Sequence, residues 1–191
     1  RGTTTCPCCG YVTKIENVKT QLKQRHGGAE DARMVCVISS IKTIRSFNKK
    51  EEEFNEVGKF YRLPHPDDFK SFDIAINDYD KLLKSNSDLI PTESTKNYVA
   101  FVNRGPLYGM VKWSDYFAKR QKLTIATLLT ILSDVKKEIK ENSPEFIKAV
   151  ITILAFAIDK QIDSLSSLTR WQANRETNSN TFGRQALPMV W

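Results

Sequence analysis

Residues 123–165, LTIATLLTILSDVKKEIKENSPEFIKAVITILAFAIDKQIDSL, contain the clearest periodic pattern in the chain. Apolar residues recur three or four positions apart up to Glu141 and again from Phe146 to Leu165, which predicts two amphipathic helices. Between them, Ser143 and Pro144 stand in the order expected of an N-cap and a first helical residue. Because this connection is short, we expect the two helices to pack antiparallel and to form the core of the C-terminal half.

The first half of the chain mixes helical and strand patterns. A short basic helix is predicted at 14–25, and a strand rich in Val and Ile at 32–44. Residues 60–63 are the expected partner of that strand, with the charged residues 49–53 at the tip of a long hairpin. Two prolines then end the hairpin. The helix predicted at 67–85 begins with Asp67 and Asp68, whose charge suits a helix N-terminus.

Loop-forming residues dominate residues 86–112 and 174–181. The first stretch is predicted to be mostly loop, with a possible strand at 98–102, and the second to be a loop or arm. The predicted class is α+β and mainly helical. Its N-terminal half combines a zinc-ribbon turn with a β-hairpin and helices, and its C-terminal half is an antiparallel pair of long helices. Residues 1–63 and 64–191 are the expected parts, or together one compact domain.

Composition excludes several classes of protein. The 191 residues are 40% hydrophobic and 27% charged, which excludes collagen-like and disordered chains and allows a core without disulfides. The net charge of +7 suits a polyanionic partner, although many basic proteins bind no nucleic acid. The most apolar window, 149–158, is too short to span a bilayer, and the chain opens without a signal peptide. We therefore expect a cytoplasmic protein with no membrane partner.

The segment Cys6-Pro7-Cys8-Cys9-Gly10 is the most informative motif for chemistry. A C-x-x-C-G turn points two thiolates to one side, as in a zinc-ribbon knuckle, so Cys6 and Cys9 are predicted zinc ligands. They form half of a tetrahedral site, and no second such pair occurs in the chain. The simplest account places the other knuckle upstream of Arg1. Cys8 could be a third ligand only with distortion, and His26 or Cys36 are arbitrary alternatives. A redox pair or plain surface cysteines are the competing interpretation.

No catalytic residue is predicted. The sequence contains no glycine-rich nucleotide loop, no H-E-x-x-H and no G-x-S-x-G motif. Its two histidines, His26 and His65, lie in loop-forming contexts. An autonomous active site is therefore not expected.

Basic and aromatic residues flank the two long predicted helices. Antiparallel helices would bring the start of the first and the end of the second to the same place. The candidate nucleic-acid-binding residues there are Lys112, Trp113, Arg120, Arg170, Trp171, Arg175 and Arg184. Arginine can contact phosphate or guanine, and tryptophan can stack on a base. Alternatively, the two tryptophans are core anchors and the cations a solvated rim.

With these residues in view, the sequence resembles the middle region of the DUF1156 family, the zinc-ribbon-containing adenine-specific DNA methylases of archaea and bacteria. The similar stretches follow the family's order and span nearly the whole chain, and the last of them is the most specific. They are residues 6–10, 25–33, 60–64, 108–117, 120–121 and 181–191.

The resemblance implies a parent enzyme whose catalytic parts lie elsewhere. In this family a SAM-binding region precedes the segment and an Asp-Pro-Pro-Tyr motif follows it, with the first zinc knuckle just upstream. The chain is then a DNA-recognition insertion of a SAM-dependent methyltransferase, with DNA and the rest of the parent chain as partners. The abrupt termini also lead us to expect a piece of a larger protein. The alternative is a non-catalytic structural or protein-interaction module.

Overall fold

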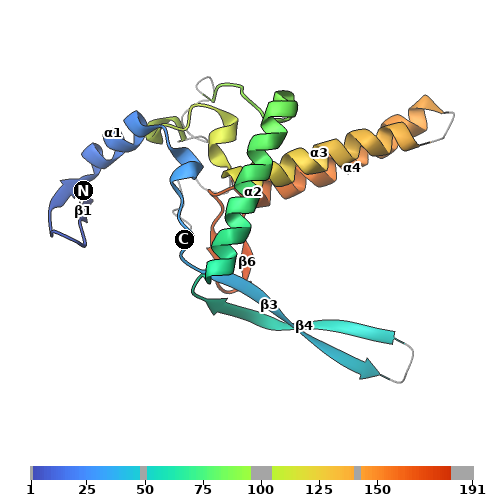
Figure 1. The fold of residues 1–191 in the computed structure, drawn as a ribbon, viewed down its shortest axis with the longest axis horizontal. Coiled ribbons are helices and arrows are strands. Elements are labelled where there is room, and N and C mark those ends of the chain that lie inside the picture. The colour runs from blue at the N-terminus through green and yellow to red at the C-terminus, as the bar shows by residue number, and fades with distance from the viewer. Residues whose placement is uncertain (1, 48–50, 96–104, 140–142, 182–191) are drawn as a thin grey trace.

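The computed structural model of the protein describes residues 2–47, 51–95, 105–139 and 143–181 (Figure 1). In these residues, four α-helices combine with three two-stranded antiparallel sheets, and the helices contain more residues than the strands. The predicted α+β class with a majority of helix is confirmed at this level. The strand predicted at 98–102 lies outside the described residues, as does Arg184.

A small hairpin and a basic helix form the N-terminal end. Strand β1 (Thr3–Thr5) pairs with β2 (Val12–Lys14), and the cysteine turn joins them. Helix α1 (Ile15–Arg25) follows directly, which confirms the helix predicted at 14–25. It ends at His26, whose left-handed backbone (φ 51°) lets its N–H reach the carbonyl of Leu22 at 3.2 Å. A 3₁₀ turn, η1 (Gly28–Asp31), comes next.

A long hairpin extends away from the helices (Figure 1). Strands β3 (Val37–Phe47) and β4 (Glu51–Arg62) pair from Val37 opposite Arg62 to Phe47 opposite Glu51. The predicted hairpin is confirmed, but its strands cover 37–47 and 51–62, whereas 32–44 and 60–63 were predicted. Residues 32–36 are not strand, and residues 51–53 belong to β4 although they were expected at the tip. Backbone ladder bonds do not depend on side-chain type, so acidic residues can continue a strand that pairing has already fixed.

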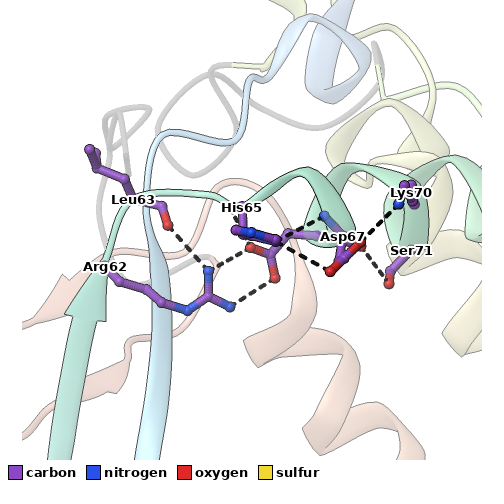
Figure 2. Close-up of polar contacts among 7 residues, drawn as sticks. Arg62, Leu63, His65, Asp67, Lys70 and Ser71 are labelled. Atoms are coloured by element: carbon purple, nitrogen blue, oxygen red, sulfur yellow. Dashed lines mark hydrogen bonds and ion pairs between the residues drawn. The ribbon is translucent and has the colours of Figure 1, made fainter.

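The hairpin is joined to helix α2 (Pro66–Ser85) by a charged corner (Figure 2). The Arg62 guanidinium donates to both carboxylate oxygens of Asp68, at 2.6 and 2.9 Å. Asp68 also accepts the N–H of His65 at 2.7 Å, which completes a capping box at the first turn of the helix. The hydrogen bonds from Arg62 hold the pKa of the Asp68 carboxyl well below its usual range, and the bond from the His65 N–H adds to this effect.

Helix α2 buries less than its sequence predicts. The helical spacing of five apolar residues predicts a buried face, but only Tyr79 is buried, while Phe69 and Leu83 are exposed. The five are Phe69, Phe72, Ile76, Tyr79 and Leu83. The reason is that α2 has one main helical neighbour, α3. Tyr79 packs there with Ala126 and Ile90 in a small core cluster.

Two 3₁₀ turns precede the C-terminal helices, η3 (Gly105–Tyr108) and η4 (Trp113–Tyr116). Ser114 and Asp115 are residue types that commonly cap a helix, but helix α3 (Lys119–Glu138) begins only at Lys119. The Asp115 carboxylate binds residues that precede it in the chain, because it accepts the N–H groups of Val111 and Lys112, each at 2.8 Å. The N-cap of α3 is instead Ala118, whose N–H is bound by the side chain of Gln121 at 2.8 Å.

Helix α4 (Pro144–Leu165) runs alongside α3, and the two extend together beyond α2 (Figure 1). Its start agrees with the sequence signal, because the Ser143 hydroxyl accepts the N–H of Phe146 at 3.3 Å. None of the described residues of α4 is fully buried. In the part of the chain that the structure describes, no helix is long and apolar enough to cross a bilayer.

The polar stretch after α4 folds back, so the expected loop or arm is corrected to a hairpin. Strands β5 (Trp171–Gln172) and β6 (Thr177–Asn178) pair, with Glu176 in a left-handed conformation at the turn. Thr181 then returns to the end of α4, where its N–H donates to the carbonyl of Asp163 at 2.8 Å. Its hydroxyl lies 2.7 Å from that of Ser166, and both side chains are buried.

Two glycines allow the N-terminal segment to approach the loop before α3. Gly109 has a φ of +87°, and a Cβ there would lie 2.8 Å from the Leu22 carbonyl oxygen of α1. Gly28 has a φ of +53°, and a Cβ there would lie 2.7 Å from the Asp115 carbonyl oxygen. Any other side chain would be strained by the backbone and obstructed by its neighbour. Segments some eighty residues apart in sequence are thus packed together.

Candidate nucleic-acid interface and cysteine turn

The start of α3 and the end of α4 are tied together by one residue, Ser167. Its N–H donates to the carbonyl of Tyr116 at 3.1 Å, and its hydroxyl donates to the side-chain oxygen of Gln121 at 2.8 Å. The same Gln121 oxygen holds the N-cap of α3. This junction brings the two segments that carry the candidate cations to one end of the helices.

A core cluster lies beneath the junction. Its buried members are Met110, Tyr116, Phe117, Ile125 and Leu168. Trp113 packs against this cluster and stacks on the Tyr116 ring, with 5.7 Å between centroids and 30° between planes. The half-buried Trp113 ring therefore has a structural role, as in the core-anchor interpretation of its sequence.

The second tryptophan, Trp171, joins the C-terminal hairpin to the long hairpin. Its indole N–H donates to the hydroxyl of Tyr61 at 3.1 Å, and the two rings meet edge to face at 6.1 Å. Trp171 is half-buried and Tyr61 is 45% exposed, so this contact lies at the surface. One edge of the indole is occupied by Tyr61.

Two lysines near the start of α3 are used within the fold. Lys119 forms an ion pair with Asp80 of α2 at 2.9 Å, and Lys122 forms one with Glu30 of η1 at 2.7 Å. The Lys122 side chain is only 12% exposed and lies over the Tyr79 ring. These charges are compensated, and they attach α3 to its neighbours.

The remaining candidate cations differ from those lysines. Lys112, Arg120 and Arg175 are exposed and Arg170 is half-buried. None of the four forms an ion pair with another residue that the structure describes. Lys112 precedes η4 and Arg120 is in the first turn of α3. Arg170 precedes β5, and Arg175 is in the turn between β5 and β6. Their charges are available to a ligand.

The cysteine turn is closed by backbone hydrogen bonds. Gly10 donates its N–H to the carbonyl of Cys6 at 2.9 Å, and Cys6 donates its own N–H to the carbonyl of Tyr11 at 2.9 Å. The N–H groups of Cys9 and Cys8 hydrogen-bond the Cys6 sulfur and lower the pKa of its thiol. A lowered thiol pKa favours the thiolate, which is the form that binds zinc.

Further ligands for this turn are not assembled in the structure. Within the described ranges, no group of three or more His, Cys, Asp or Glu side chains could hold a metal ion. His26 is at the far end of α1, an 11-residue helix about 16 Å long, and its ring bonds the carbonyl of Gly109 at 3.1 Å. Cys6 and Cys9 could supply at most two of the four ligands that a tetrahedral zinc ion needs.

The residues that build the junction were not identified from the sequence. Gln121 occupies the third position of α3, where a capping-box glutamine binds back to the N-cap, and this spacing was a usable signal. The role of Ser167 had no local signal, because its two partners lie about 50 residues earlier in the chain. Tyr61 likewise meets Trp171 only through the tertiary fold.

Comparisons with known proteins add no relative. No family model matches the sequence, and neither the curated proteins nor the solved structures contain a significant match.

Proposed function

We propose that the chain is a DNA-recognition segment of a SAM-dependent, adenine-specific DNA methyltransferase of the cytoplasm, without catalytic motifs of its own. The observation that supports DNA binding best is the Ser167 junction. It brings the segment carrying Lys112 and Arg120 next to the end of α4, from which Arg170 and Arg175 follow. The methyltransferase parent is proposed from the resemblance of the sequence.

Electrostatics favour phosphate as the ligand of this end of the molecule. The chain has a net charge of +7, and the four cations have no carboxylate partner among the described residues. Lys119 and Lys122, a few residues away, do have such partners. Each lysine or arginine that neutralises a phosphate releases a condensed counterion, so binding by these side chains would depend strongly on salt.

Base stacking contributes less to the proposed binding than the phosphate contacts do. Trp113 packs against the core and stacks on Tyr116, so its ring is not offered as a platform for a base. Trp171 keeps a partly exposed ring, held by Tyr61, between the candidate cations Arg170 and Arg175. In the proposal the cations position the duplex through its phosphates, and the Trp171 ring adds base stacking at the edge of this contact.

The parent enzyme would supply the chemistry. A methyltransferase must move its target adenine out of the duplex, and backbone contacts beside the site help to hold the opened DNA. SAM and the catalytic motif belong to other parts of the proposed parent. Zinc is proposed for the parent too, with Cys6 and Cys9 as two of its four ligands and a structural role.

The test measures binding of the purified chain to a fluorescent duplex of about 25 base pairs at 50 and 200 mM salt. Four phosphate contacts predict a loss of affinity of about 100-fold over this range, because each contact adds about 0.9 to the slope of log affinity against log salt. Binding that is absent, or independent of salt, would contradict the DNA role.

Calorimetry with SAM tests the non-catalytic part of the proposal separately. The titration should be flat, since the chain has no glycine-rich cofactor loop. Saturable binding of SAM at micromolar concentration would show that a cofactor site lies within these residues.

A further inference from the structure

The face of α4 that points away from α3 is apolar and exposed. The exposed fractions are 53% for Phe146, 68% for Ile153 and 67% for Phe156. With the exposed Ala149, these residues recur every three or four positions, so they form one stripe along the helix. Three large side chains in a row approach the few hundred Å² of apolar surface that marks an interaction site.

The opposite face of the helix is already used. Ile147, Ile151, Ala155 and Ile158 are half-buried and follow the same spacing on the side of α3. The outer stripe therefore takes no part in the packing of α4 against α3. In the described part of the chain, the Phe156 ring contacts no other aromatic ring and no cation.

Charges and side-chain sizes along α4 are complementary to those of a second, reversed copy. Glu145 is near the start of the stripe and Lys160 continues it at the other end, so an antiparallel copy sets each beside the opposite charge. With a two-fold axis next to Ile153, the same register places the small Ala149 opposite the large Phe156. A parallel copy would instead set Glu145 against Glu145 and Phe156 against Phe156.

We propose that the stripe Phe146, Ala149, Ile153, Phe156 is a self-association surface, on which α4 of a second copy of this chain packs antiparallel. The contact is isologous, so each copy contributes the same residues. Phe156 of each copy meets the small Ala149 of the other, which allows the two helices to approach closely. The inference does not depend on DNA binding, because none of its residues belongs to the proposed DNA face.

A contact between two single helices is small. Its area is well below the roughly 800 Å² per partner of a standard interface, so we expect a dissociation constant on the order of 10 µM. The dimer should therefore appear only as concentration rises, which sets the range of the experiment.

Sedimentation equilibrium of the 191-residue chain between about 1 and 300 µM tests the proposal, a range chosen around the expected affinity. A reductant and a chelator are included so that exposed cysteines or shared metal cannot join two copies. A monomer–dimer equilibrium is expected. A chain that stays monomeric over the whole range would overturn the proposal.

Substitutions locate the surface. Ile153→Glu places two like charges at the axis and should weaken dimerisation at least about tenfold. Ile74→Glu is the matched control, since Ile74 is a 60% exposed isoleucine on α2, and it should leave the equilibrium unchanged. Equal effects of the two variants, or none from Ile153→Glu, would overturn the assignment to α4. Circular dichroism verifies that each variant retains its helices.

A charge exchange tests the antiparallel arrangement. Glu145→Lys and Lys160→Glu should each weaken the dimer, because each places like charges side by side. The double variant exchanges the two charges and should restore the affinity to within about threefold, as expected of coupled residues. Failure of the double variant to recover would overturn the antiparallel register.

Discussion

The hydroxyl of Ser167 donates a hydrogen bond of 2.8 Å to the side-chain oxygen of Gln121, and so ties the segment after α4 to the first turn of α3. The same Gln121 oxygen accepts the N–H of Ala118 and thereby caps α3. One side chain thus caps a helix and also holds the segment that follows the neighbouring helix. The proposed DNA face depends on this junction, because the cations on its two sides come from these two segments.

Replacing Ser167 by alanine should lower the free energy of unfolding by about 1 kcal/mol, the usual net value of one hydrogen bond. Gln121→Ala should cost more, about 2 kcal/mol, because it removes the helix cap as well. Urea denaturation measures both. Ser133→Ala, on the exposed side of α3, is the control and should change stability by less than about 0.5 kcal/mol. Equal effects at Ser133 and Ser167 would show that the junction adds nothing.

The corner formed by Arg62 and Asp68 should make stability depend on pH. The pKa of Asp68 is well below its usual range in the folded chain, chiefly because of the hydrogen bonds from Arg62. An aspartate in the unfolded chain has a pKa of about 3.9, so the stabilisation is complete above that pH and is lost as the pH falls toward the folded pKa.

Asp68→Asn should therefore flatten the fall of unfolding free energy between about pH 4 and pH 2. Asp67→Asn is the matched control, since Asp67 is in the same helical turn but has a 70% exposed side chain that pairs with Lys70. If the two variants show the same pH dependence as the unmodified chain, the corner does not contribute through ionisation.

Cys6 and Cys9 should not hold zinc tightly in this chain alone, because two thiolates leave a tetrahedral site half filled. After treatment with a mild chelator, metal analysis should find well below one zinc per chain. One tightly held zinc per chain that is lost in Cys36→Ser or His26→Ala would contradict this expectation. It would also require His26 to leave its contact with Gly109.

Local signals in the sequence were sufficient for much of the fold. The start of α4 could be predicted from Ser143 and Pro144, because an N-cap serine and a first-turn proline act within one turn of helix. Helix α1 could be predicted from the spacing of Ile15, Val18 and Leu22, and α2 from the acidic residues that follow two prolines. The start of α3 could not, since Asp115 can cap a following helix or bind preceding N–H groups, and only the tertiary structure selects the second.

The candidate site was predictable only as a set of residue types. The sequence could not decide whether Trp113 stacks on a base or packs in the core, because a tryptophan suits both roles. Its contact with Tyr116 depends on how the loop before α3 folds. Similarly, the sequence does not distinguish Lys122 from Arg120, since both are cations at the start of the same helix. In the structure Lys122 pairs with the Glu30 carboxylate, whereas Arg120 has no such partner among the described residues.

The central claim is that Lys112, Arg120, Arg170 and Arg175 bind DNA as one face. Changing all four to glutamate should weaken duplex binding and reduce the slope of log affinity against log salt by about 3 to 4, with little change in the thermal midpoint. The matched control changes four exposed lysines outside this face to glutamate, so it changes the net charge by the same amount as the first variant. These are Lys70, Lys84, Lys136 and Lys148.

The most direct measurement is the salt slope of duplex binding for the unmodified chain and these two quadruple variants, side by side. The account predicts a lowered slope for the first variant and a nearly unchanged slope for the control. If the first variant binds with the slope and affinity of the unmodified chain, the four cations are only a solvated rim. Any DNA role would then belong to the basic helix α1.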